Sequence, residues 1–219
     1  MATTLIKICG IQDADTALAA ADAGARWVGL VFVEESPRFV TIEQACAVAA
    51  SLPKPVTPVG LFVDAHADAI KDVAQRVGLH TVQLHGHEPM SILDDLADLR
   101  VIKALPFDDE LPAKAEPWDN APNVDALLID TPPEGALTGG SGVAFDWKAL
   151  SHMRDEVRKP IILAGGLTPD NVGEAIRIVR PYAVDVSSGV ESSRGVKDVG
   201  LIKAFCEAVR EADAAFDGQ

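Results

Sequence analysis

Short apolar runs alternate along the chain with longer stretches that are rich in alanine. The short runs contain mostly β-branched and aliphatic residues, and several are apolar almost throughout, as in parallel strands that are buried on both faces. We therefore expect eight strands, at residues 5–9, 27–32, 57–63, 81–84, 101–105, 126–130, 161–164 and 183–187. The number of strands is the feature that decides between the possible architectures.

Helix start and stop signals lie between these runs. We expect helices at residues 14–23, capped by Asp13 and followed by Gly24, at 45–52, after the capping-box pair Thr41 and Gln44, from the cap Asp64 to Gly78, at 171–179, after Thr168-Pro169, and at about 198–214. Between Leu105 and Ala126, three prolines leave room for a helix of only a turn or two.

Eight βα units in 219 residues predict an α/β fold, a single (β/α)8 TIM barrel that spans residues 1–219. An open, doubly wound sheet is the alternative. That fold needs a glycine-rich turn after the first strand, which Cys9-Gly10-Ile11 does not provide. In a closed barrel the chemistry gathers where the strands end, so the residues that follow each apolar run are the candidates for a site.

The charge of the chain restricts its partners. Nineteen Lys and Arg against 33 Asp and Glu give a net charge of −14, which disfavours binding to nucleic acid and to anionic membranes. No apolar run is long enough to span a bilayer, and the first ten residues lack the pattern of a signal peptide. Three scattered cysteines fit reduced thiols, so we expect a cytoplasmic protein with a small-molecule substrate.

Three strand ends carry residues with possible chemistry. Cys9 shares a strand face with Lys7 and could act as a base or nucleophile if nearby positive charge lowers its pKa; the alternative is a small buried hydrophobe. Arg38 follows Ser36-Pro37, and its planar fork suits a carboxylate, although a solvated loop arginine is the alternative. Asp130 ends an apolar strand, where partial desolvation favours the protonated, proton-donating form; a helix cap is the alternative.

Other polar residues favour a structural interpretation. Alternation places Gln83, His85 and His87 on one strand face, where a polar wall at the barrel mouth is favoured over a metal site. Lys103 and Asp185, inside apolar runs, are expected to form a buried ionic cluster with Lys7 in the barrel.

Three glycine-rich turns follow one another late in the chain: Gly139-Gly140-Ser141-Gly142, Ala164-Gly165-Gly166-Leu167 and Ser187-Ser188-Gly189-Val190. Small residues let backbone N–H groups approach an anion, and the last two turns follow strands seven and eight, where barrels build phosphate sites. No nucleotide-binding glycine motif is present.

Taken in order, these segments resemble one family. The segments are Lys7-Ile8-Cys9-Gly10, Ser36-Pro37-Arg38, Val59-Gly60-Leu61-Phe62-Val63, Gln83-Leu84-His85-Gly86, Gly139-Gly140-Ser141-Gly142 with Phe145-Asp146-Trp147, Leu163-Ala164-Gly165-Gly166-Leu167 and Asp185-Val186-Ser187-Ser188-Gly189-Val190-Glu191. From about residue 5 to the final helix, the chain is similar to the phosphoribosylanthranilate isomerases of tryptophan biosynthesis. His87 departs from the pattern, since an acidic residue is expected there.

The resemblance implies an Amadori rearrangement of N-(5-phosphoribosyl)anthranilate to 1-(2-carboxyphenylamino)-1-deoxyribulose 5-phosphate, without a metal or an organic cofactor. It implies that Asp130 is the general acid, that Cys9 is the general base and that Arg38 holds the anthranilate carboxylate. The residues that it implies for substrate and phosphate binding are Gly165, Gly166, Ser188 and Gly189, with Gly140, Ser141 and His85. Relatives of this kind are usually monomers, so we expect a monomer, with a homodimer as the alternative.

Other phosphosugar barrels remain as alternatives. Indole-glycerol-phosphate synthase needs a Lys and Glu pair, ribulose-phosphate epimerase needs a His and Asp metal set, and a dual-substrate isomerase needs an acidic base at the position of Cys9. A barrel that only binds a phosphosugar would not need Cys9, Arg38 and Asp130 together.

Overall fold

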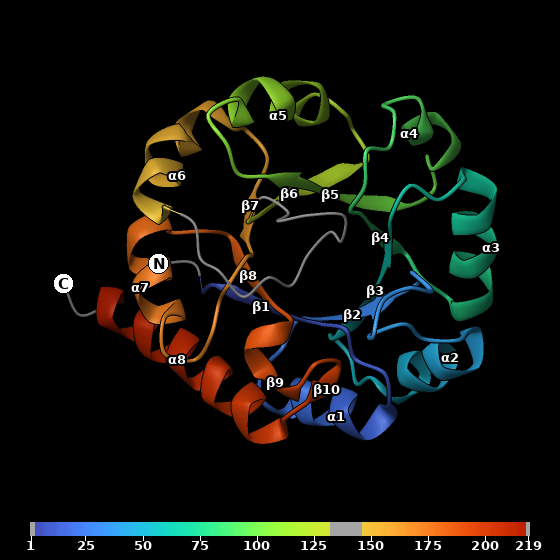
Figure 1. Ribbon diagram of the computed structural model, residues 1–219, viewed down its shortest axis with the longest axis horizontal. Coiled ribbons are helices and arrows are strands. Elements are labelled where there is room, and N and C mark those ends of the chain that lie inside the picture. Colours follow the sequence, from blue (N-terminus) through green and yellow to red (C-terminus); the bar gives the residue numbers. More distant parts are fainter. Residues whose placement is uncertain (1–2, 132–145, 218–219) are drawn as a thin grey trace.

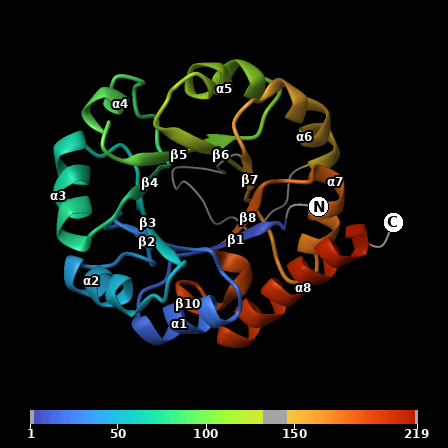
Figure 2. The ribbon, with the colours of Figure 1, turned by 180° about the vertical axis from the view of Figure 1, so that it is seen from behind.

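The computed structural model describes residues 3–131 and 146–217, and its eight parallel strands close into a barrel inside a ring of helices (Figures 1 and 2). The barrel strands are β1 (Leu5–Cys9), β2 (Trp27–Val31), β3 (Thr57–Phe62), β4 (Thr81–Leu84), β5 (Arg100–Pro106), β6 (Val124–Asp130), β7 (Ile161–Leu163) and β8 (Ala183–Val186). Each strand pairs with the next in the sequence, and β8 returns to pair with β1. The predicted (β/α)8 barrel and all eight predicted strands are confirmed.

The helices lie outside the barrel in chain order (Figure 1). They are α1 (Ala14–Asp22), α2 (Ile42–Ser51), α3 (Ala67–Val77), α4 (Ile92–Asp95), α5 (Leu111–Asp119), α6 (Trp147–Met153), α7 (Val172–Val179) and α8 (Val199–Asp217), with 3-10 turns η1 (Arg154–Glu156) and η2 (Ser188–Val190). A small antiparallel hairpin of β9 (Glu191–Ser193) and β10 (Val196–Lys197) separates β8 from α8. Among the described residues, no helix combines the length and the apolar character needed to cross a membrane.

Side-chain alternation along the strands creates two separate cores. Val59, Ile102, Leu128 and Ile162 belong to one cluster, which fills the inside of the barrel. The alternate residues, such as Ile8, point outward and pack in a larger cluster with the helices. Because strand pairing puts neighbouring side chains at the same level, the inward residues near the carboxyl ends form one upper layer.

Two of the predicted helix caps are confirmed. The Asp13 carboxylate accepts a hydrogen bond from the Thr16 N–H at the start of α1. Thr41 and Gln44 form the complete capping box of α2. Both motifs act within four residues, so the local sequence is sufficient to specify them.

The predicted cap at Asp64 is wrong, although Gly78 does end α3 with φ of 78°. The residue at the N-cap of α3 is His66, and Asp64 adopts a left-handed φ of 51°. The Asp64 carboxylate instead accepts a hydrogen bond from His87 N at 2.6 Å. A contact with the distant β4–α4 turn therefore replaces the local cap.

The predicted cap at Thr168 is also wrong, because α7 begins later, with Asn171 at its N-cap. The Asn171 side chain accepts from Thr168 N at 2.8 Å and donates to Gly166 O at 2.9 Å. These bonds stabilise the turn that follows β7. Helix α5 is longer than predicted, since it accommodates Pro112 in its first turn and Pro117 inside.

The predicted ionic cluster forms only in part. Lys7 and Asp185 are paired inside the barrel at 2.9 Å. Lys103 lies between Ile102 and Ala104, which both point inward, so its own side chain points outward. There it pairs with Glu88 at 2.6 Å, and its ammonium lies 5.2 Å from the ring centroid of Trp118. Lys103 is therefore outside the cluster expected around Lys7.

Candidate active site

A cavity of about 100 Å³ opens at the carboxyl ends of the barrel strands. Its lining comes from strand ends and from the loops that follow them: Cys9, Val31, Val33, Ser36, Arg38, Leu61, Val63, Gln83, His85, Asp130, Asp185 and Ser187. Cys9, Arg38, His85 and Asp130, all singled out in the sequence, thus line one cavity although 121 positions separate Cys9 from Asp130. Closure of the barrel brings them together.

Cys9 lies in the upper inward layer of the barrel and is 5% exposed. Its neighbour on β2 is Gly29, where a Cβ atom would lie 2.8 Å from the Cys9 Sγ. Burial raises the pKa of the Cys9 thiol above its usual value, while the charge of Lys7 opposes that rise. Lys7 thus lowers the thiol pKa by its own contribution, as the shared strand face of Lys7 and Cys9 suggested, but burial has the larger effect.

Lys7 is fully buried beneath Cys9 and donates a hydrogen bond to Asp185 at 2.9 Å. Burial favours loss of the ammonium proton, but the negative charges of Asp185 and Cys9 outweigh it and raise the pKa of Lys7. The barrel therefore holds a fixed positive charge next to the thiol, compensated by one carboxylate.

Arg38 reaches the cavity across Gly10. That glycine has φ of 82°, and a Cβ atom there would lie 2.6 Å from Arg38 Cδ. The guanidinium donates from Nε and Nη2 to Glu191 over 2.7 and 3.0 Å. These contacts orient a partly buried cation toward the cavity, as a carboxylate-binding residue requires.

Lys197 is a functional candidate that the sequence reasoning missed. Its ammonium donates to Glu191 Oε1 at 2.7 Å and to Ser187 O at 2.9 Å. Ser187 in turn donates to Cys9 O at 3.1 Å. Lys197 comes from a polar hairpin after the last barrel strand, and no local sequence pattern marks it. Only its short spacing along the chain from Glu191, within one hairpin, could have suggested a contact between them.

Asp130 lies opposite this group, at the end of β6. His85 Nε2 is 3.4 Å from Asp130 Oδ2, and His85 Nδ1 is 2.8 Å from the Gln83 side-chain nitrogen. A second Asp130 oxygen accepts from the N–H of Thr131 at 2.7 Å. The alternative role of Asp130 as a helix cap finds no support, because Asp146 caps α6.

His87 does not share the inward face of Gln83 and His85. Strand β4 ends at Leu84, the turn at Gly86 interrupts the alternation, and the His87 side chain is 92% exposed. Among the described residues, no group of three or more His, Cys, Asp or Glu side chains is arranged to hold a metal ion.

Of the other cysteines, Cys206 is buried on α8, and this burial raises its pKa to about 11.

The two glycine-rich turns after β7 and β8 lie against each other. Gly165 and Gly166 have φ of 81° and 63°, which favour glycine. A Cβ atom on Gly189 would lie 1.8 Å from Leu167 O, so the η2 turn with Ser188 packs directly on the β7 turn. No backbone hydrogen bond found within residues 3–131 and 146–217 uses the N–H of Gly165 or Gly166. The other two expected phosphate-binding residues, Gly140 and Ser141, lie outside the described residues.

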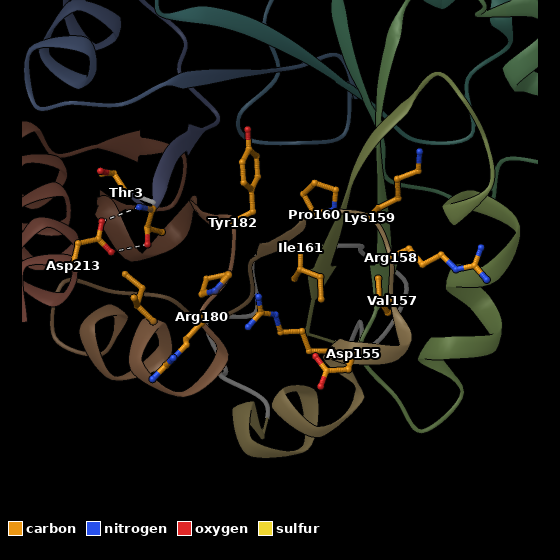
Figure 3. Close-up of a pocket in the computed structure, with 14 residues that line it drawn as sticks. Thr3, Asp155, Val157, Arg158, Lys159, Pro160, Ile161, Arg180, Tyr182 and Asp213 are labelled. Atoms are coloured by element: carbon orange, nitrogen blue, oxygen red, sulfur yellow. Dashed lines mark hydrogen bonds between the residues drawn. The ribbon is translucent and has the colours of Figure 1, made fainter. Parts of the chain in front are cut away.

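A larger cavity, of about 550 Å³, lies at the opposite end of the barrel (Figure 3). It is lined by the starts of β7 and β8 and by several basic residues. Arg158 and Lys159 point in different directions, and their cationic ends bond to Asn120 Oδ1 and Ala121 O at 3.1 and 2.9 Å (Figure 3). The carboxyl-end cavity is therefore the better candidate for catalysis.

Comparison with known families agrees with this geometry. A model of the family described as N-(5'phosphoribosyl)anthranilate (PRA) isomerase matches residues 6–208. The N-(5'-phosphoribosyl)anthranilate isomerase of Pseudomonas aeruginosa (strain LESB58) is 44% identical over 212 residues, which cover 96% of this chain and 97% of that protein. The residues quoted for the resemblance thus lie within one continuous match.

Solved structures show the same fold. The phosphoribosyl anthranilate isomerase from Thermotoga maritima has a TM-score of 0.85 and 40% identity, over 95% of this chain and 100% of its own. A phosphoribosyl anthranilate isomerase in complex with reduced 1-(o-carboxyphenylamino)-1-deoxyribulose 5-phosphate has a TM-score of 0.81 and 38% identity, with the same coverage. The expected enzyme class, an isomerase, is confirmed, whereas the expected monomer stays a prediction. The chain belongs to the N-(5'-phosphoribosyl)anthranilate isomerase family.

Proposed function

We propose that this chain converts N-(5'-phosphoribosyl)anthranilate to 1-(2-carboxyphenylamino)-1-deoxyribulose 5-phosphate by an Amadori rearrangement, as a step of tryptophan biosynthesis. The observation that carries the proposal is the single cavity lined by Cys9, Arg38 and Asp130. Family membership supports the substrate, and the cavity supports the assignment of roles.

The substrate is anchored at both ends. Its aryl carboxylate binds Arg38, whose position is fixed by Gly10 and Glu191. Its phosphate binds at the turns with Gly165, Gly166, Ser188 and Gly189, where glycine lets backbone N–H groups approach an anion closely. Two fixed ends leave the pentose little freedom, and such positioning can lower the barrier to reaction by several kcal/mol.

Proton transfers complete the reaction. Protonated Asp130 gives its proton to the furanose ring oxygen, and the C1'–O bond breaks as the anilino nitrogen lone pair forms a protonated Schiff base. The Cys9 thiolate then removes the C2' proton, and the electron pair neutralises the iminium to give an enolamine. Tautomerisation moves the enol proton to C1' and gives the ketone. Cys9 releases its proton, Asp130 regains one, and the sums of atoms and electrons are unchanged.

The environments of the two groups suit these roles. His85 lies beside Asp130 and Thr131 N donates to it, so the carboxylate left after proton donation has polar partners. Burial raises the pKa of Cys9, which makes its thiolate a stronger base once formed, and Lys7 supplies the positive charge that lets it form.

A turnover assay tests the proposal. The fluorescence of N-(5'-phosphoribosyl)anthranilate is followed with the wild type, Cys9→Ala and Asp130→Asn. Because general acid–base groups contribute about 100-fold to 10,000-fold, each variant should lose at least about 100-fold in kcat.

Two substitutions serve as matched controls. Cys46→Ala removes a thiol from α2, and Asp125→Asn removes a carboxylate from the other end of β6, where it pairs with Arg100. Both should keep wild-type turnover. A wild-type chain without turnover, or Cys9→Ala and Asp130→Asn variants that match these controls, would refute the proposal.

A further inference from the structure

Three charged side chains are held together beside the catalytic cavity. Arg38 donates to both carboxylate oxygens of Glu191, and Lys197 donates to Glu191 Oε1 at 2.7 Å. Their side chains are only 11%, 4% and 4% exposed, for Arg38, Glu191 and Lys197 respectively. We refer to Arg38, Glu191 and Lys197 as the Arg38 cluster.

The hairpin β9–β10 fixes this cluster against the loop after β2. Gly195 in the hairpin turn has φ of 85°, and its N–H donates to Glu191 Oε2 at 3.0 Å. A Cβ atom on Gly195 would lie 2.7 Å from Pro37 O, so the hairpin packs directly on the loop that carries Arg38. Each Glu191 oxygen therefore has two fixed donors.

The charges of the cluster do not cancel. Arg38 and Glu191 alone form a neutral pair, and Lys197 leaves the cluster with one net positive charge. Glu191 occupies two N–H groups of the guanidinium, and an arginine side chain has five. The remaining edge can therefore receive a second carboxylate in a bidentate geometry.

We propose that Glu191 and Lys197 are positioning residues that make Arg38 selective for the aryl carboxylate of the substrate, an inference that rests on the function proposed above. Glu191 sets the plane of the guanidinium, so that one edge faces the cavity. Lys197 compensates the charge of Glu191, which would otherwise repel the incoming carboxylate.

Lys197 also connects this carboxylate site to the proposed base. Its ammonium donates to the Ser187 carbonyl at 2.9 Å, and Ser187 donates to Cys9 O. One continuous set of contacts therefore joins Arg38, which binds the carboxylate, to the backbone of Cys9, the proposed base. Burial lowers the pKa of Lys197, but the charge of Glu191 and its hydrogen bond favour the ammonium form.

Binding measurements separate selectivity from general stability. The probes are reduced 1-(2-carboxyphenylamino)-1-deoxyribulose 5-phosphate and the same compound with an unsubstituted phenyl ring, titrated by calorimetry. The wild type should prefer the carboxylate compound, and Lys197→Gln should lose about tenfold of that preference while its affinity for the phenyl compound is unchanged. Lys197→Arg keeps the charge and should restore the preference.

Two further variants make the result interpretable. Lys203→Met removes a positive charge from the exposed face of α8 and should keep the wild-type preference. Glu191→Gln removes one of the two carboxylate acceptors that set the plane of the guanidinium, so its preference for the carboxylate compound should also fall, although the cluster becomes more positive. It also provides a test if Lys197→Gln does not fold.

The inference is overturned if Lys197→Gln weakens the binding of both compounds equally, or if Glu191→Gln keeps the full wild-type preference, because the cluster would then not set the selectivity of Arg38. Failure of the proposed function looks different: the wild type would then turn over no N-(5'-phosphoribosyl)anthranilate. The turnover assay with the unmodified chain therefore distinguishes the two cases.

Discussion

At the scale of single residues, two glycines decide where the side chains of Cys9 and Arg38, both proposed site residues, can lie. A Cβ atom at Gly29 would collide with the Cys9 sulfur, and one at Gly10 would collide with the Arg38 side chain. The sequence shows these glycines only as parts of short motifs. Their function depends on side chains that lie 20 and 28 positions away, so it becomes visible only when the strands are paired.

Lys7→Met tests the electrostatic control of Cys9. Lys7 opposes the rise of the Cys9 pKa that burial causes, and Asp185 adds to that rise. Removal of the ammonium should therefore raise the thiol pKa further, so that the increase of kcat/KM with pH moves to more alkaline pH. The pH dependence of Cys9 alkylation, in a Cys46→Ala background, measures the same shift directly.

The control for this experiment is the double variant Lys7→Met/Asp185→Asn. It removes the carboxylate that Lys7→Met leaves unpaired in the barrel. Part of the shift should be reversed, because Asp185 itself raises the pKa of Cys9. If the alkylation profile is the same in the wild type and in Lys7→Met, Lys7 has no influence on the thiol.

At the scale of elements, the sequence was sufficient where a signal is local. Apolar runs predicted every barrel strand, and the caps at Asp13 and Thr41 were confirmed. Asp64 was assigned to a cap by the same kind of signal, but its carboxylate has a stronger partner in the backbone of a later turn. Lys103 was placed on the wrong side of its strand, because its neighbours Ile102 and Ala104 both face into the barrel and alternation turns Lys103 outward. Tertiary contacts thus overrode short-range patterns.

The buried pair of Glu88 and Lys103 connects β5 to the β4–α4 turn and gives a test at this scale. Glu88 also accepts hydrogen bonds from Asp64 N and Gly86 N, and its side chain is 1% exposed. Glu88→Gln leaves a buried ammonium without its negative partner, so the free energy of unfolding should fall by about 3 kcal/mol. Urea denaturation measures this loss.

Asp125→Asn is the matched control for this test, because the pair of Asp125 and Arg100 lies on the surface of the same sheet. An exposed pair of this kind contributes about 0.2 to 1 kcal/mol. Equal losses for the two variants would contradict the view that burial makes the Glu88 pair important.

At the scale of the whole molecule, closure of the barrel determines which residues can act together. Eight strands were predicted from the sequence, and closure then places Cys9, Arg38 and Asp130 at one rim. The Glu191 and Lys197 contacts were beyond sequence reasoning, because a hairpin outside the eightfold repeat folds back onto the β2 loop. A segment added to the eightfold repeat leaves no periodic signal in the sequence, although this hairpin contacts Arg38 in the candidate site.

The same hairpin makes the free energy of unfolding of the whole molecule depend on pH in the acid range. Although burial acts in the opposite direction, hydrogen bonds from Arg38, Lys197 and Gly195 lower the pKa of Glu191 from 4.5 to about 2. A carboxyl group with a lowered pKa stabilises the folded state fully above its unfolded value, and this contribution disappears as the pH falls toward its folded value. For Glu191 the contribution is at most about 3 kcal/mol near neutral pH and should be lost between about pH 4.5 and pH 2.

Urea unfolding of the wild type and Glu191→Gln at pH 6 and pH 3 measures this contribution. The wild type should exceed the variant in free energy of unfolding at pH 6, and the difference should be clearly smaller at pH 3, because the amide in the variant has no proton to gain. The net charge of −14 affects both proteins almost equally, so the comparison isolates the one carboxyl group. A difference that stays constant between the two pH values would mean that the Glu191 carboxylate is not held by the Arg38 cluster.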